Sequence, residues 1–255
     1  MTFVPQNELE ESLLKAIQEP EHRPQFYRDL ANATLFIIQH GVPLPKEHGR
    51  HEMQAGEQIQ IMQVEANGKQ YIPVFSALLR LQPMITGESA YLGMNALELF
   101  RLTRGSSLLL NPGSEFCKEL SVGEITEIID GTIGKPVETR VAEQDVTVEI
   151  GQPANYPVEL VETLKKLFAK DKRVKRAWIA QFLDPRVDQK SHSILAIEVT
   201  KDYEAVMADI GVVVNGIEIP DPPLDIIQIT GNDGIEEYFT DELKPFYVRK
   251  RFGIF

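Results

Sequence analysis

The segment Ser106–Glu124 constrains the fold more than any other stretch of the chain. Its first five residues, Ser-Ser-Leu-Leu-Leu, are typical of a buried strand, and the turn sequence Asn-Pro-Gly-Ser follows at residues 111–114. Proline presets φ at the second position of a type II turn, and glycine accepts the positive φ at the third. Ser121 and Glu124 have the spacing of a capping box before an apolar run. The segment therefore predicts a strand, a tight turn, a short irregular segment and a helix.

The rest of the chain alternates between helical and strand periodicity. Residues 8–18 place Leu9, Leu13, Leu14 and Ile17 on one face of an amphipathic helix. Further helices are predicted over 23–32, 76–83, 95–103, 157–170, 203–211 and 234–239, and strands over 33–39, 58–64, 69–75, 106–110, 146–150, 174–183, 193–200 and 224–230.

Turn chemistry fixes one hairpin in the first half of the chain. The dipeptide Asn67-Gly68 separates two apolar runs and favours a two-residue hairpin turn. Pro73, in the second of these runs, has no N–H for a sheet ladder, so we expect it at an edge or at a strand end.

This order of elements predicts an α+β fold. Each half has helices and a few strands, which indicates two mixed α/β-sandwich domains, each a small sheet with helices packed on it. A charged, apolar-poor stretch separates the halves. We expect a first domain over residues 1–135, a linker over 136–144 and a second domain over 145–255.

Composition excludes several classes of function. The chain has 26 Lys and Arg against 38 Asp and Glu, a formal net charge of −12, and phosphate binding needs a cationic face, so general nucleic-acid binding is disfavoured. Its apolar runs are far shorter than the roughly 20 residues that a bilayer requires. The N-terminal residues lack the basic and apolar parts of a signal peptide. We therefore expect a cytoplasmic protein without a membrane span.

The residue types of common catalytic sites occur without their motifs. The chain has neither a glycine-rich phosphate loop nor a nucleophile elbow. His48 and His51 have the spacing of a metal pair, but they lie in a polar stretch where histidines are usually solvated. Cys117, the one cysteine, stands beside Lys118, which would lower a thiol pKa on close approach; a bystander thiol is the simpler interpretation. We predict no catalytic residues, no metal site and no cofactor.

Two segments are unusually basic for an acidic chain. Lys165–Arg176 holds seven cations and one acid at the end of a predicted helix. There the cations suit the helix dipole, and an anionic partner is the alternative. The tail Lys244–Phe255 has four cations, four aromatic residues and no acid. Either Phe246 and Tyr247 pack on the core and the cations lie on the acidic body, or the tail docks on another chain.

The candidate partner contacts come from the turn and the tail. The turn could present backbone N–H groups to an anion, although its proline and glycine are explained by geometry alone. The residues that we expect to meet a partner are Asn111, Ser114, Glu115, Arg249, Lys250, Arg251, Phe252 and Phe255.

Six short motifs follow one another in an order that covers nearly the whole chain. They are Phe26-Tyr27-Arg28, residues 68–76, residues 110–116, Gly151-Gln152-Pro153, Arg176-Ala177-Trp178 and Pro245-Phe246-Tyr247. Through these motifs the chain resembles the bacterial enhanced serine sensitivity protein SseB family, the first three in its N-terminal domain and the others in its C-terminal domain. The resemblance implies a cytoplasmic, two-domain bacterial protein without established catalytic residues. It also implies a link to serine or general amino-acid metabolism, or to its regulation.

We therefore expect a non-enzymatic interaction or regulatory protein whose partners are other proteins or a second copy of the chain. The alternative is a small-ligand sensor or an enzyme with a pocket between the domains. An exposed apolar patch would favour the interaction protein, and a deep polar pocket would favour the alternative.

Overall fold

The structure is a computed structural model of the chain. It describes residues 3–39, 58–85, 87–135, 147–186, 188, 190–231 and 234–250. The chain divides into two compact units. The first consists of Met1–Glu19 and Gln25–Ile133, and the second of Pro20–Pro24 and Gly134–Phe255. The linker predicted over 136–144 lies outside the described residues.

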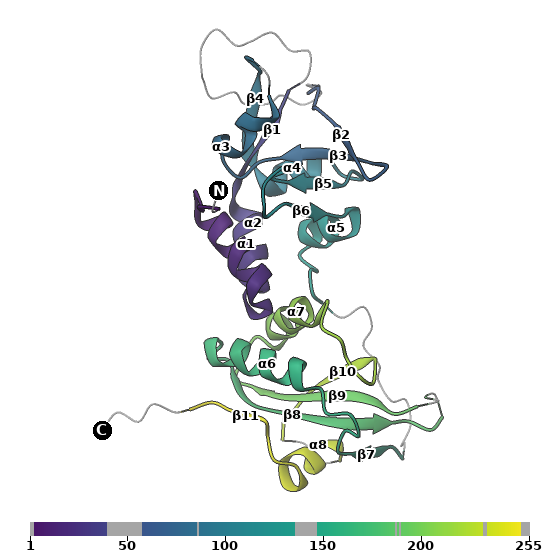
Figure 1. Cartoon of the computed structure of the whole chain (residues 1–255). Helices are drawn as coiled ribbons and strands as arrows, with labels where there is room; N and C mark the ends of the chain where they lie inside the picture. Colours follow the sequence, from purple (N-terminus) through teal and green to yellow (C-terminus); the bar gives the residue numbers. More distant parts are fainter. Residues whose placement is uncertain are drawn as a thin grey trace, which may run out of the picture. The chain divides into compact units, whose positions relative to one another are not determined.

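The first unit packs helices on a small, mostly antiparallel arrangement of strands (Figure 1). Strands β2, β3, β5 and β6 form a four-stranded sheet in that order, in which β3 and β5 are parallel. Strands β1 and β4 form an antiparallel pair, and Phe36 of β1 exchanges two backbone hydrogen bonds with Phe75 after β3. The elements are α1 (Glu8–Gln18), α2 (Arg23–Asn32), β1 (Thr34–Ile38), β2 (Val64–Ala66), β3 (Lys69–Val74), α3 (Leu78–Leu81), the 3-10 helix η2 (Gln82–Met84), β4 (Tyr91–Asn95), α4 (Ala96–Leu102), β5 (Leu108–Leu110), β6 (Lys118–Leu120) and α5 (Val122–Asp130).

The turns predicted from local chemistry are confirmed. Asn67 and Gly68 both have positive φ, 52° and 74°, as the hairpin between β2 and β3 requires. In the turn at residues 111–114, the N–H of Ser114 donates to the carbonyl of Asn111 at 3.1 Å, and Gly113 has a φ of 78°. Both features match a type II turn. Ser121 and Glu124 form the predicted capping box of α5.

Pro73 lies in β3 beyond the three residue pairs with β2 and before the Phe75–Phe36 pair. β3 is an inner strand of the sheet and Pro73 is its next-to-last residue, so neither predicted position, an edge strand or a strand end, is exact. The proline is tolerated because its missing N–H falls between the two pairings on that side of the strand.

Several predicted strand boundaries are wrong in the first unit. The strand expected over 58–64 is the shorter β2 at Val64–Ala66, and the sequence analysis contained neither β4 nor β6. Strand β4 includes a glycine and an asparagine, and β6 is Lys-Glu-Leu, so both have low intrinsic strand propensity. These two strands form because of tertiary pairing: β4 pairs with β1, and β6 pairs with β5.

Helix α1 presents a different face to the core than predicted. Leu9, Leu13 and Ala16 are buried together with Glu10, whereas Ile17 is 51% exposed. The predicted inward position of Ile17 is therefore wrong. A buried carboxylate contradicts simple amphipathic patterning, and its partners across the unit explain it below.

The second unit has a five-stranded sheet with helices on both faces (Figure 1). Its strands follow the order β10, β9, β8 and β11, and β7 also pairs with β8; only β9 and β10 are parallel. The elements are the 3-10 helix η1 (Pro20–His22), β7 (Glu149–Gly151), α6 (Val158–Lys170), β8 (Val174–Leu183), β9 (His192–Val199), α7 (Tyr203–Val214), β10 (Leu224–Gln228), α8 (Ile235–Glu237), the π-helical turn η3 (Tyr238–Glu242) and β11 (Tyr247–Val248).

Each face of this sheet has its own core. Phe168 of α6 and Ile210 of α7 belong to the cluster on one face. Trp178 of β8 and Phe239 of η3 belong to the cluster on the other face. Both units thus pack helices on small sheets, which confirms the predicted α+β class.

Candidate functional site

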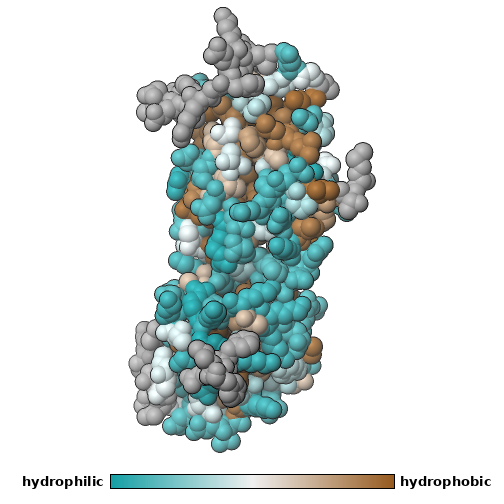
Figure 2. Space-filling model, turned by 90° about the vertical axis from the view of Figure 1, so that its left-hand side faces the viewer, coloured by the Kyte–Doolittle hydropathy of each residue, from teal (hydrophilic) through white to brown (hydrophobic). Residues whose placement is uncertain are grey.

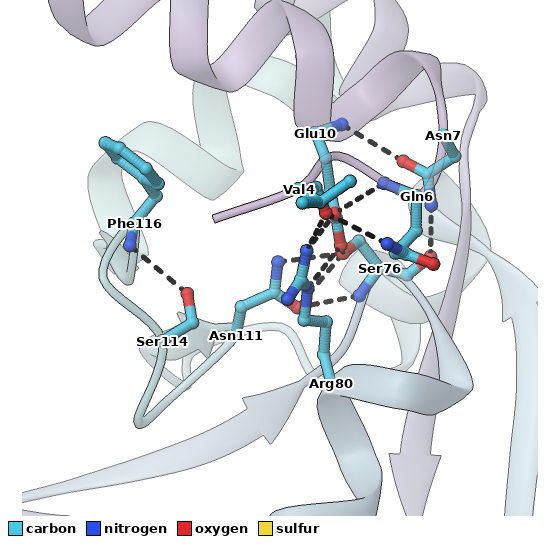
Figure 3. A network of polar contacts seen from close by, with 9 residues as sticks. All are labelled: Val4, Gln6, Asn7, Glu10, Ser76, Arg80, Asn111, Ser114 and Phe116. Carbon is cyan, nitrogen blue, oxygen red and sulfur yellow. Dashed lines mark hydrogen bonds and ion pairs between the residues drawn. The ribbon is translucent and has the colours of Figure 1, made fainter. Parts of the chain in front are cut away.

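The turn at residues 111–114 belongs to a polar network in the first unit (Figure 3). Ser76 follows β3 and Asn111 follows β5, so the two parallel strands bring these residues together at their carboxyl ends. Asn111 is fully buried. Its Oδ1 accepts the Ser76 N–H at 2.9 Å, and its Nδ2 donates to Ser76 Oγ at 2.8 Å. The positive φ of Asn111, 52°, directs the chain into the turn.

A buried ion pair completes the network. Glu10 has no exposed surface and receives both donors of a bidentate Arg80 guanidinium: Nε at 3.0 Å from Oε1 and Nη2 at 2.7 Å from Oε2. Ser76 Oγ donates to Glu10 Oε1 at 2.5 Å, and the N–H of Gln6 donates to Oε2 at 2.9 Å. The network therefore fixes the first turn of α1 to the sheet and to α3.

Residues near the N-terminus lie over Arg80. The guanidinium carbon is 4.1 Å from the centre of the Phe3 ring, and Nη2 also donates to the Val4 carbonyl at 2.6 Å. The Phe3 ring meets Phe116 edge-on with centroids 4.7 Å apart, and the Phe116 N–H donates to Ser114 Oγ at 3.2 Å. The polar groups of the network thus have internal partners, which indicates a structural role.

The charge state of Glu10 follows from two opposing effects. Burial by itself raises the pKa of Glu10, but the hydrogen bonds from Arg80, Ser76 and Gln6 outweigh it and lower the pKa below its usual 4.5. The carboxylate is therefore ionised at neutral pH and forms the ion pair.

Acid is expected to weaken the first unit through Glu10. Because the folded-state pKa is lowered, the stabilisation is fully present above the unfolded-state pKa and is lost as pH falls through the folded-state pKa. The free energy of unfolding, measured by denaturant titration between about pH 7 and about pH 3, should fall less steeply for Glu10→Gln than for the wild type. Glu115→Gln, at an exposed carboxylate, should keep the wild-type slope. Equal slopes for all three proteins would contradict this role.

The structure separates the three candidate contacts in the turn. Asn111 is buried, and its side-chain amide is hydrogen-bonded to Ser76. Asn111 therefore shapes the turn and does not touch a partner. Ser114 is half-buried and Glu115 is exposed. Only these two can meet a partner directly.

The tail is ordered on the second unit as far as the structure describes it. Phe246 and Tyr247 both pack on Phe168 of α6, and the Tyr247 hydroxyl donates to the Phe168 carbonyl at 2.8 Å. The N–H of Arg249 donates to the Lys175 carbonyl at 2.8 Å, beside β8. The expected packing of the two aromatic residues is confirmed.

The candidate contacts of the tail have different positions. Arg249 is half-buried, and its guanidinium donates to the Lys172 carbonyl. Lys250 is exposed. Arg251, Phe252 and Phe255 lie outside the described residues.

The basic segment Lys165–Arg176 is neutralised within the second unit. Six of its seven cations lie between 2.6 and 3.8 Å from a carboxylate. Arg173 binds both Asp171 and Asp209, at 2.7 and 3.0 Å. These pairs favour the structural interpretation of the segment over an anionic partner.

One group of metal-ligating side chains occurs in the described ranges. Glu19, Glu21 and His22 carry ligand atoms close enough to share an ion. Lys170 Nζ, however, is 2.8 Å from His22 Nε2 and 3.7 Å from Glu21 Oε1. An ammonium group thus already lies beside both ligands, and we assign no metal site. The pair His48 and His51 lies outside the described residues.

Cys117 lacks the features of an activated nucleophile. Burial raises the pKa of its thiol. The neighbouring Lys118 ammonium lies 2.9 Å from Glu124 and 5.9 Å from the Tyr27 ring centre. The raised thiol pKa agrees with a bystander thiol, the simpler interpretation from the sequence.

An exposed apolar surface lies beside the network in the first unit. Leu78 and Leu79 of α3 are 38% and 50% exposed, and the half-buried Met84 and Ile85 follow them. We call these four residues the α3 surface. Figure 2 shows that hydrophobic side chains gather on the visible face of the first unit, whereas the visible face of the second unit is mostly hydrophilic.

This surface was not predicted from the sequence, although the residues of α3 carry a signal for it. The run Ala77-Leu78-Leu79-Arg80-Leu81 has four apolar residues in five, and one turn of helix cannot turn all of them inward. Leu81 faces the core, and Arg80 reaches Glu10. Leu78 and Leu79 remain outside.

Comparisons with known proteins agree with both halves of the chain. The family model described as the SseB protein N-terminal domain matches residues 9–127, and that of the SseB protein C-terminal domain matches residues 142–249. Proteins named Protein SseB from Escherichia coli (strain K12) and from Shigella flexneri are each 31% identical over 247 residues, which cover 96% of this chain and 93% of the relative. No solved structure matches significantly. Among the described helices, none has the length and apolar character needed to cross a bilayer.

Proposed function

The chain belongs to the SseB family, and from this premise we propose that it is a non-enzymatic interaction or regulatory protein of the bacterial cytoplasm. The observation that carries the proposal is the α3 surface. Exposed apolar side chains that lie close together in the sequence, as these do, are candidates for a protein-binding site.

The contacts that hold α3 on the first unit support this role. Arg80 is fixed to Glu10 by two hydrogen bonds, and Leu81 is 3% exposed. These two residues hold the four-residue helix from inside, so Leu78 and Leu79 are presented without freedom to turn inward. Fully burying an exposed leucine gains roughly 1.5–3 kcal/mol. Leu78 and Leu79 are 38% and 50% exposed, so a partner that covers them would recover the corresponding part of that gain from each.

Further contacts are proposed in each unit, independently of the α3 surface. Ser114 and Glu115 in the turn and Arg249 and Lys250 in the tail are accessible positions, and we include the sequence-based contacts Arg251, Phe252 and Phe255. Asn111 contributes only through the shape of the turn. We further propose domain limits at 1–135 and 145–255, and a regulatory link to amino-acid metabolism remains a prediction.

Charging the α3 surface is expected to abolish partner binding. Leu79→Glu places a carboxylate at the more exposed of the two α3 leucines, and we expect cross-linked protein adducts in cells to fall about tenfold or more, as loss of one strongly contributing apolar contact allows. Tagged wild-type and variant chains at native expression level are cross-linked in cells, and their adducts are quantified by mass spectrometry.

Leu102→Glu is the matched control, because Leu102 is also an exposed leucine, 45% accessible, but lies on α4. It should keep the wild-type adducts. If Leu79→Glu retains them as well, the α3 surface is not the binding site and the proposal fails.

A further inference from the structure

A buried histidine in the second unit lies between two carboxylates. His192 is the first residue of β9 and is 3% exposed. Its Nε2 is 2.8 Å from Oδ2 of Asp225 in β10. Its Nδ1 is 3.8 Å from Oδ2 of Asp188, which lies in the loop of residues 184–191 between β8 and β9. The imidazole therefore lies between a strand of the sheet and the hairpin loop.

The two distances show that one ring nitrogen is hydrogen-bonded and the other is not. A carboxylate oxygen accepts, so Nε2 donates its proton to Asp225. A neutral imidazole then has no proton on Nδ1, and 3.8 Å is too long for a hydrogen bond to Asp188. Nδ1 without a proton thus lies beside a negative carboxylate, and a second ring proton would turn this unfavourable contact into an attractive one.

Asp188 also holds the loop together. The N–H of Asp184 donates to Asp188 Oδ2 at 2.9 Å, and the N–H of Asp188 donates to the Asp184 carbonyl at 2.8 Å. Oδ2 of Asp188 is the same oxygen that lies 3.8 Å from His192. The position of the Asp188 side chain therefore determines both the shape of the loop and its link to β10.

The other charged groups of the loop do not compete for the ring. Arg186 binds Asp184 at 2.8 Å, and its hydrogen bonds lower the pKa of Asp184. Lys190, the other cation of the loop, is exposed. Among the described residues, His192 is the one cation-forming side chain within ion-pair distance of the two carboxylates that flank it.

The sheet side of the ring brings no further charge. β8 presents the uncharged ring of Phe182, whose centre is 5.4 Å from that of His192. Helix α8 covers the apolar cluster to which Phe182 belongs. Its Glu236 accepts the N–H groups of Thr230 and Gly231, which follow the far end of β10. The ring thus meets one carboxylate from the loop and one from β10.

We propose that His192 is a charge-dependent latch: a proton on Nδ1 draws Asp188 to the ring and fixes the loop against β10, and loss of that proton loosens the loop. A doubly protonated imidazole donates from both nitrogens, so it joins the two carboxylates by two charge-assisted hydrogen bonds. Histidine side chains generally gain this charge between about pH 8 and about pH 5. Acid therefore orders the loop. This device lies in the second unit and does not depend on the α3 surface.

Amide exchange of the intact chain tests the latch. The protection factor compares each amide with the same amide of an unfolded chain at the same pH, so the intrinsic pH dependence of exchange cancels. The reporter is the Asp184 N–H, which bonds to Asp188 Oδ2. We expect its protection factor, measured by NMR, to rise about tenfold from about pH 8 to about pH 5, as one added charge-assisted hydrogen bond allows. Equal protection factors over this range would overturn the proposal.

Asp188→Asn tests the carboxylate of the loop. Asparagine keeps an oxygen for the Asp184 N–H but removes the negative charge that attracts the protonated ring, so the rise in the protection factor should disappear. Asp202→Asn is the matched control, because Asp202 is an exposed aspartate of the same unit without a side-chain capping bond. It should keep the wild-type rise. An Asp188→Asn chain that also keeps it would reject the latch.

His192→Gln distinguishes the ring from every other titrating group. Glutamine retains a donor for Asp225 but gains no charge in acid, so the protection factor of the Asp184 amide should be the same at both ends of the pH range. A rise that persists in this variant would mean that another group carries it, and the proposal would fail. If His192→Gln does not fold, Asp188→Asn decides alone, because it leaves the buried ring in place.

Discussion

Arg80→Ala is expected to lower the free energy of unfolding of the first unit by about 3–5 kcal/mol, the usual cost of removing one partner of a buried ion pair. Glu10 has no exposed surface, and the Arg80 side chain is 15% exposed, so the substitution removes the countercharge from a carboxylate in a largely buried site. Ser76 and Gln6 still donate to it, but neither supplies a positive charge. Chemical denaturation at neutral pH measures the loss.

Arg104→Ala provides the matched control in the same unit. Arg104 and Asp130 form an ion pair at 3.6 Å, with side chains 61% and 49% exposed. Exposed pairs of this kind contribute about 0–1 kcal/mol. If Arg80→Ala costs no more than Arg104→Ala, the network does not hold α1 on the sheet, and the structural role assigned to it is wrong.

The same network shows where sequence reasoning ends. The turn at residues 111–114, the Asn67-Gly68 hairpin and the capping box are all fixed within four residues, so local chemistry predicted them. Ser76 and Arg80, by contrast, are separated from Glu10 by 66 and 70 positions. Nothing in the periodicity of α1 marks Glu10 as buried, because its charge becomes tolerable only when α3 brings Arg80 to it.

The candidate site likewise has features that local sequence predicts and features that depend on distant residues. Asn111 was identified from its turn, but its burial depends on Ser76 in another strand, which a turn sequence cannot indicate. The outward position of Leu78 and Leu79 follows from the short length of α3 and from the inward anchors on either side of it. The bonding of Phe36 to Phe75 joins β1 to the end of β3, a pairing between distant residues that residue types alone do not specify.

A close backbone contact in the second unit leads to the other large expected effect. Gly211 lies inside α7, and a Cβ there would overlap the carbonyl oxygen of Gly134. A Cβ on Gly134 would in turn overlap the Ala208 carbonyl, and Gly134 also has a φ of 74°. Two glycines thus let the chain after α5 lie directly against the backbone of α7.

Gly211→Ala is therefore expected to destabilise the second unit by about 3 kcal/mol or more, toward the upper end of the cost of overpacking, since backbone cannot move aside as a side chain can. Helix propensity alone predicts the opposite sign, because glycine in a helix interior costs roughly 0.5–1 kcal/mol relative to alanine. Gly123→Ala in α5 is the matched control: the nearest atom to its added Cβ is Ser121 Oγ at 4.0 Å, so this variant should be neutral or slightly stabilised. Thermal and chemical unfolding measure whether the free energy of unfolding falls or rises in each variant. A stabilised Gly211→Ala would mean that Gly134 does not lie against α7 in solution, because only that contact reverses the intrinsic preference for alanine.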